Sequence, residues 1–214
     1  MMMAIILGMG SSSDSGLSDH QDGIKYTSAI DRYCPSIFFV IDPDTVSQFM
    51  IVSGKGVNSM NEMNLQFSKA GTSDALVLNC ISKSAFDSDV EVGAPSKGGP
   101  PGYMSLSFHT KMARLNRLFK LTEHGLIVGG AILFPDRDML NVGRIFVSPE
   151  HFRKGYGTWM MQEIEAMFPD VKGFTLDTPI WNVRTNRFYT KLGYSEVRRD
   201  REFIYYLKSV DRGK

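Results

Sequence analysis

The spacing of apolar residues divides the chain near residue 63. Beyond this point, apolar positions alternate as in strands or recur every three to four residues as in helices. The strands are predicted at 64–70, 118–121, 126–134, 140–147, 171–178, 194–199 and 201–208. A first helix is predicted to begin at a cap, Thr72 or Ser73. Three more are predicted over 103–115, 155–168 and 182–192, and Gly193 ends the last one. This order predicts an α/β fold in which helices flank a mixed, mostly antiparallel sheet.

Residues 1–62 follow a different pattern. A polar, turn-rich run covers 10–23, and two apolar runs, Ile37–Ile41 and Phe49–Val52, flank an Asp-Pro-Asp turn signal. We therefore predict that 1–62 is an N-terminal extension of unknown role, partly disordered or a hairpin, before a domain at 63–210. Two explanations stay open: the true start is Met60 or Met63, or the hairpin packs on the sheet or on a second subunit. We interpret the extension as dispensable for catalysis.

Composition narrows the classes of protein. The 214 residues are 43% hydrophobic and carry a net charge of +1, so no basic excess favours nucleic acid. No apolar run approaches a membrane span, and the first ten residues lack the basic region of a signal peptide. We expect a cytoplasmic protein, and a homodimer stays open. Cys34 and Cys80 form neither a disulfide framework nor a metal site by spacing, and Cys80 fits a buried, reduced thiol.

The first candidate for chemistry is the basic, glycine-containing loop in LNVGRIFVSPEHFRKGYGT, residues 140–158. It connects an apolar strand to a helix, and helix N-termini bind anions because their N–H groups lack partners. Gly155 and Gly157 let the backbone approach a phosphate closely, and Arg153 and Lys154 add positive charge. The alternative is a solvated basic loop.

The second candidate is LDTPIWNVRTNRFYTKLGY, residues 176–194. Asn182 falls at the start of a helix, and Tyr189 lies seven residues on, so the two share a face. An amide can bind an amide-bearing cofactor arm, and a phenol can protonate a thiolate leaving group. The alternative is that Asn182 caps the helix and Tyr189 is a core aromatic.

Together the two segments resemble the GNAT (GCN5-related) N-acetyltransferase superfamily. That family has a phosphate loop written [Q/R]-x-x-G-x-[G/A], followed by Asn, an aromatic-Tyr pair and Lys-Leu-Gly-[Phe/Tyr]. The matching positions are Phe152–Gly157, Asn182, Phe188-Tyr189 and Lys191–Tyr194. The strand and Thr-x-Asp at 64–74 resemble the family's usual start, so the resemblance covers roughly 64–208.

The resemblance implies a transferase that uses acetyl-CoA as co-substrate, needs no metal, and acetylates a primary amine by direct attack. Tyr189 would be the general acid toward the departing thiolate. A backbone N–H near Val147 would hold the oxyanion. The cofactor would be bound by the backbone of Phe146 and Val147, by the loop residues Phe152, Arg153, Lys154, Gly155, Tyr156, Gly157 and Thr158, and by Asn182.

The sequence departs from the family pattern at two points. Position 152 is Phe where the family prefers Gln or Arg, and the strand before the loop carries no acid to act as base. A water chain would serve as the base, or the amine arrives neutral. These departures support the alternative of a catalytically silent acyl-CoA-binding regulatory module. A third class, an interaction domain built from 1–62, has little support.

The acceptor side is expected in the loop 88–105, where the resemblance places an acceptor-binding loop. Asp87, Asp89 and Glu91 would attract a cationic amine, or else they form a solvated acidic turn. His109 and His124 have no partner in the pattern and are interpreted as surface or helix residues.

Overall fold

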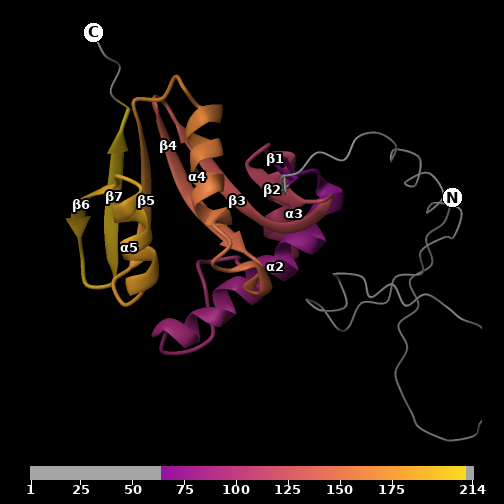
Figure 1. The fold of residues 1–214 in the computed structure, drawn as a ribbon, viewed down its shortest axis with the longest axis horizontal. Coiled ribbons are helices and arrows are strands. Elements are labelled where there is room, and N and C mark those ends of the chain that lie inside the picture. Colours follow the sequence, from indigo (N-terminus) through magenta and orange to yellow (C-terminus); the bar gives the residue numbers. More distant parts are fainter. Residues whose placement is uncertain (1–63, 211–214) are drawn as a thin grey trace, which may run out of the picture.

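Seven strands form one sheet in the order β1-β2-β3-β4-β5-β7-β6 (Figure 1). This is a computed structural model that describes residues 64–210, so the predictions for 1–62 lie outside it. The strands are β1 (Leu65–Lys69), β2 (Leu118–Glu123), β3 (Leu126–Asp136), β4 (Met139–Val147), β5 (Gly173–Pro179), β6 (Ser195–Arg199) and β7 (Phe203–Ser209). Only β4 and β5 pair in parallel. The predicted order and the mostly antiparallel sheet are confirmed.

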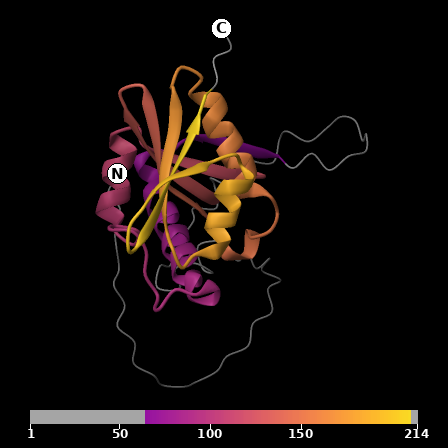
Figure 2. The same ribbon diagram turned by 90° about the vertical axis from the view of Figure 1, so that its left-hand side faces the viewer.

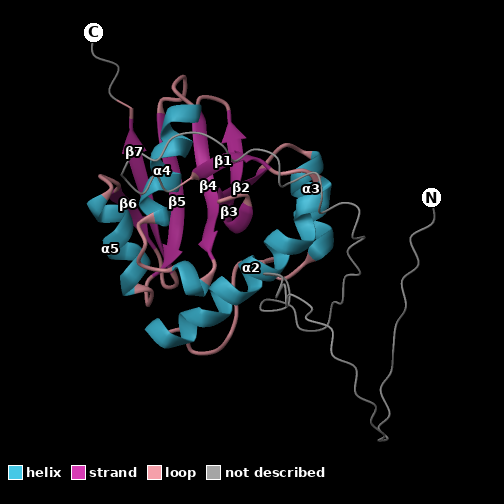
Figure 3. Ribbon diagram, turned by 45° about the vertical axis from the view of Figure 1, so that its right-hand side comes forward, coloured by secondary structure: helices cyan, strands magenta, loops and turns pink. Residues whose placement is uncertain are grey.

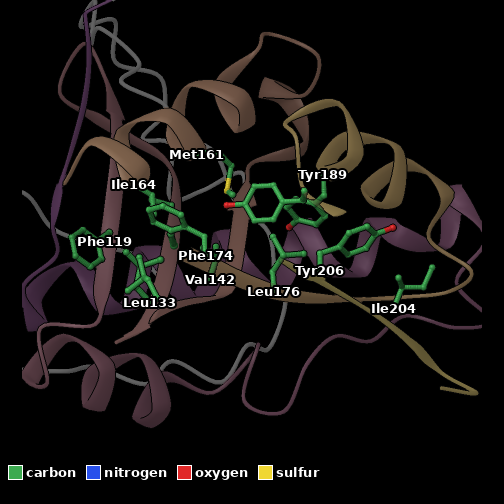
Figure 4. Close-up of a cluster of buried hydrophobic side chains, with 13 residues drawn as sticks. Phe119, Leu133, Val142, Met161, Ile164, Phe174, Leu176, Tyr189, Ile204 and Tyr206 are labelled. Carbon is green, nitrogen blue, oxygen red and sulfur yellow. The ribbon is translucent and has the colours of Figure 1, made fainter. Parts of the chain in front are cut away.

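Four α-helices in the described region cover the two faces of the sheet (Figure 3). They are α2 (Ala75–Asp87), α3 (Leu106–Arg114), α4 (Tyr156–Met167) and α5 (Val183–Lys191). Leu78 of α2 and Met112 of α3 pack with Phe146 on one face. On the other, Met161 of α4 and Tyr189 of α5 pack on β5, as Figure 4 shows. Figure 2 shows the strands between α3 on one side and α4 and α5 on the other. Within 64–210, no helix has the length and apolar character needed to cross a bilayer.

Two predicted helix starts are wrong. The first helix is preceded by a 3-10 turn, η2 (Thr72–Asp74), and neither Thr72 nor Ser73 is a cap. Instead, the Asp74 carboxylate accepts a hydrogen bond of 2.8 Å from the Gly71 amide. The second helix begins at Leu106 rather than 103, because Ser105 caps it by accepting from the Phe108 amide at 3.3 Å.

A bulge in β4 changes which side chains face which helix layer. Ile132 pairs with Arg144 and Leu133 with Val142, so Gly143 is an extra residue in β4. A Cβ at Gly143 would come within 2.3 Å of the Phe134 ring, so any other residue here would displace that ring. Val142 therefore lies in the core with α4 and α5, whereas Arg144 and Phe146 face α2 and α3.

Candidate active site

The candidate site begins where β4 and β5 part. Their pairing covers only Met139–Asn141 with Gly173–Thr175, although both strands continue. Asn141 closes this pairing by donating to the Thr175 carbonyl and hydroxyl oxygens at 3.3 and 3.2 Å. From Val142 to Val147, β4 pairs with β3 alone. One backbone edge of β4, which includes the predicted Phe146 and Val147, is therefore open to an added extended chain.

The loop that follows this edge connects β4 to the start of α4. After Val147 the chain forms the 3-10 turn η4 (Pro149–His151), and Arg153 and Gly155 then adopt positive φ angles of 63° and 84°. A Cβ at Gly155 would meet no atom within 4 Å, so space lies outside the loop there. In a helix that begins at Tyr156, the N–H groups of 156–158 have no partner one turn earlier. The structure thus presents several of the predicted cradle amides at one helix end.

Tyr156 anchors this loop rather than facing outward. Its ring is 2% exposed, and its hydroxyl donates to Glu123 at the end of β2. His151 Nε2 lies 3.3 Å from the same carboxylate, and its ring stacks on Tyr156 at 6.0 Å. Burial and Glu123 raise the pKa of Tyr156 to about 12, so the phenol keeps its proton and remains a donor. Glu123 and His151 therefore hold the loop against the β2–β3 hairpin.

Asn182 lies at the start of α5, as predicted, and it caps the helix. Its Oδ1 accepts from the Thr185 amide at 3.1 Å, and its Nδ2 donates to Asp89 at 3.3 Å. The residue is 2% exposed. The capping alternative is therefore confirmed. A contact with the cofactor stays a prediction, and it is compatible with capping because Nδ2 carries a second hydrogen.

Asp89 links three parts of the site that are far apart in sequence. It lies in the turn η3 (Ser88–Val92) and pairs with Arg184 of α5 at 2.6 Å, in addition to Asn182. The Arg184 guanidinium in turn lies over the Phe152 ring of the loop, 5.1 Å from its centroid. Burial raises the pKa of Asp89, while Arg184 and Asn182 oppose the rise. The loop 88–105, the loop that contains Phe152 and the helix α5 are thereby joined.

Tyr189 is a core aromatic, as the alternative held, and it shares the buried side of α5 with Asn182. The side chain is 7% exposed and contacts the rings of Phe188, Tyr194 and Tyr206. Burial and the charges of Asp177 and Asp89 raise the pKa of its hydroxyl above the usual value, so it is a neutral donor at neutral pH. Its role as the acid remains a prediction.

The acids of the 88–105 loop do not form a solvated turn as a group. Asp87 is held by Lys83 at 2.5 Å and by the Tyr103 hydroxyl at 3.0 Å. Asp89 is buried, and Glu91 alone is exposed. His109 is a helix residue, as one of its two interpretations held, and it lies fully buried in α3; His124 is a turn residue. Cys80 is a buried thiol, as predicted.

Sequence reasoning missed three residues that support the site: Glu123, His151 and Arg184. No short-range pattern reveals them, because each acts across strands or loops distant in sequence. Arg184 carried one usable signal, since it lies within the second motif and two residues after Asn182.

Comparison with protein families gives one match. Residues 114–196 match the family model described as "Acetyltransferase (GNAT) domain". This segment contains β2 to β5, α4 and α5, and hence the loop, Asn182 and Tyr189. No curated protein matches the chain.

Solved structures share the fold of the described region. The PaiA N-acetyltransferase from Thermoplasma acidophilum, solved with coenzyme A, is 14% identical with a TM-score of 0.61, covering 69% of this chain and 100% of its own. A GNAT-family acetyltransferase from Streptococcus agalactiae is 16% identical with a TM-score of 0.61, covering 69% and 96%. The ribosomal-protein-S18-alanine N-acetyltransferase from Escherichia coli is 17% identical with a TM-score of 0.52, covering 70% and 96%. At these identities the similarity establishes the fold.

Proposed function

Since residues 114–196 belong to the GNAT acetyltransferase domain family and residues 64–210 have its fold, we propose that this chain is an acetyl-CoA-dependent N-acetyltransferase. It transfers an acetyl group to a primary amine of a small molecule or protein, and we expect it to act in the cytoplasm. The observation that carries the proposal is the unpaired edge of β4 beyond Asn141, which leads directly to the N-terminus of α4.

The residues present fit the two polar parts of acetyl-CoA. The amide-bearing pantetheine arm would bind along Phe146 and Val147 as an added strand. The pyrophosphate would bind the amides of 153–158, where the helix dipole and Arg153 and Lys154 favour anions. Asn182 would contact the pantetheine or adenylate side. Phe152 supplies no charge, but Arg184 over its ring brings a guanidinium to the same loop.

The chemistry needs no covalent enzyme intermediate. The neutral amine attacks the thioester carbonyl carbon, and a backbone N–H near Val147 holds the resulting oxyanion. Collapse breaks the carbon–sulfur bond, and the leaving thiolate takes the proton of Tyr189. Water molecules accept the proton that the amine nitrogen loses and return a proton to the Tyr189 phenolate. Between Met139 and Val147, β4 carries no carboxylate that could take this part.

The alternative function is a silent acyl-CoA-binding module, which Phe152 and the missing acid on β4 favour. The two are separated with the full chain, acetyl-CoA and a panel of primary amines, by measuring thiol release and confirming the acetylated product by mass spectrometry. We expect amine-dependent turnover. Tight acetyl-CoA binding without turnover of any amine would favour the silent module, and absence of binding in calorimetry would reject both.

A further inference from the structure

Arg144 of β4 is a buried cation that no carboxylate of the described residues neutralises. Its side chain lies over the Phe108 ring, 4.4 Å from the centroid, and Nη2 donates to the carbonyl oxygen of Pro101. The residue is 8% exposed, and no carboxylate within 64–210 pairs with it. Burial lowers its pKa to about 10, so the guanidinium is still charged at neutral pH.

This arrangement leaves hydrogen-bonding capacity unused. Arg144 Nη1 is buried and has no partner among the described residues. The neighbouring His109 donates through Nδ1 to the Ser105 carbonyl oxygen at 2.9 Å, which leaves its buried Nε2 unpaired within 64–210 as well. Buried charges are normally paired, because an isolated one is costly to desolvate. A carbonyl dipole and an aromatic ring compensate this cation only in part.

The position of Arg144 relates this charge to the proposed reaction. Arg144 and Phe146 lie on the same face of β4, and two residues of a strand span about 7 Å. Pro101 belongs to the loop in which the acceptor is expected. The acids of that region that might attract a cation, Asp87 and Asp89, are already paired with Lys83 and Arg184. The uncompensated buried charge beside the acceptor loop is therefore positive.

We propose that Arg144 determines acceptor specificity, and that the acceptor is an amine that also carries a carboxylate, such as an amino acid. The inference rests on the proposed function and deepens it. The carboxylate first bonds to Nη1 and then displaces the Pro101 carbonyl from Nη2, giving the paired contact that guanidinium and carboxylate favour. The 93–105 segment shifts to admit it.

The test compares each amino acid with its own carboxamide as acceptor for the full chain. The carboxamide has the less basic amine, so more of it is neutral at a given pH. Amine ionisation alone would therefore favour the carboxamide and cannot explain a preference for the acid. We expect kcat/KM to be at least about tenfold higher for the acid, which is about 1.4 kcal/mol. Arg144→Gln should abolish the preference by raising KM for the acids alone, and Arg144→Lys should retain part of it. Arg117→Gln is the matched control, since Arg117 also lies over a ring, that of Phe134 at 5.4 Å.

A binding measurement tests the role of Arg144 without requiring acetyl transfer. Calorimetry with N-acetylglycine and N-acetylphenylalanine, against their amides, should show binding of the acids to the wild type and at least about tenfold weaker binding to Arg144→Gln. Equal turnover of acids and amides would overturn the role of Arg144 while leaving the acetyltransferase intact. Equal binding of acids and amides, or binding of neither, would overturn it too. Turnover of no amine at all, with the acids still bound through Arg144, would count against the transferase alone.

Discussion

Tyr189 packs in the core through its ring, and its hydroxyl is the proposed general acid. Burial keeps the phenol protonated, and its ring contacts three other aromatic rings of the core. Replacement by Phe removes the hydroxyl and keeps the ring. If Tyr189 is the acid, kcat in Tyr189→Phe should fall by roughly 10²-fold, with little change in CoA affinity, as general acid catalysis requires. Steady-state kinetics and calorimetry measure the two, and a kcat within about a factor of two of wild type would make Tyr189 a packing residue alone.

His109 predicts a dependence of stability on pH. Burial lowers its pKa below the value near 6.5 of an unfolded chain, and the charge of Arg144 acts in the same direction. Below about pH 6.5 the unfolded state therefore binds this proton more readily than the folded state, so the free energy of unfolding falls as pH falls through this range.

The matched variants for this prediction are His109→Asn and His124→Asn. The asparagine side chain in His109→Asn keeps a donor for the Ser105 carbonyl and does not titrate. His124 lies in a turn with a positive φ of 49° that an asparagine tolerates. Urea unfolding at about pH 7.5 and about pH 5.5, on either side of the histidine range, should show a smaller loss of stability in His109→Asn than in wild type or His124→Asn. An unchanged loss would assign the acid sensitivity to other groups.

At the scale of elements, the junction of β4, its loop and α4 should be the most sensitive part of the proposed cofactor site. Gly155→Val places a branched side chain at a φ of 84° and in the space beside the loop amides. We expect CoA affinity to fall by at least about tenfold, or ~1.4 kcal/mol. Gly193→Val is the control for backbone strain, because Gly193 has a φ of 86° at the far end of α5. Calorimetry in which both variants bind CoA like wild type would remove the cradle assignment.

The element order was predictable because each strand and helix carries its own period of apolar residues. The strands at 126–134 and 140–147 became β3 and β4 with ends moved by one or two residues. The bulge at Gly143 was not predictable, since it depends on the Phe134 ring of the neighbouring strand. For the same reason, sequence periodicity could not assign Arg144 to the α2–α3 face. The two motifs were found, but the contacts of Asp89 and Glu123 that support them depend on tertiary structure.

At the scale of the whole molecule, the described domain has a continuous sheet and helices on both faces, all built from residues 64–210. We expect a chain that begins at Met63 to be soluble, with a melting temperature and acetyl-CoA turnover close to those of the full chain. Thermal unfolding and the thiol-release assay compare the two. An insoluble or inactive shortened chain would show that the extension belongs to the working fold and that the boundary at residue 63 is wrong.

The ion pair between Asp89 and Arg184 should form late when the chain folds during its synthesis. It joins residues 95 positions apart, and β5, which precedes α5, completes its pairing only with the still later β7. Contacts of such long sequence separation form late, because the intervening chain must first be ordered. A nascent chain that ends before Arg184 therefore has the loop Phe152–Gly157 but lacks the Asp89–Arg184 ion pair beside it. A ligand stabilises only the state that binds it. Acetyl-CoA should therefore stabilise the folded form of the complete chain and have no such effect on shorter nascent chains.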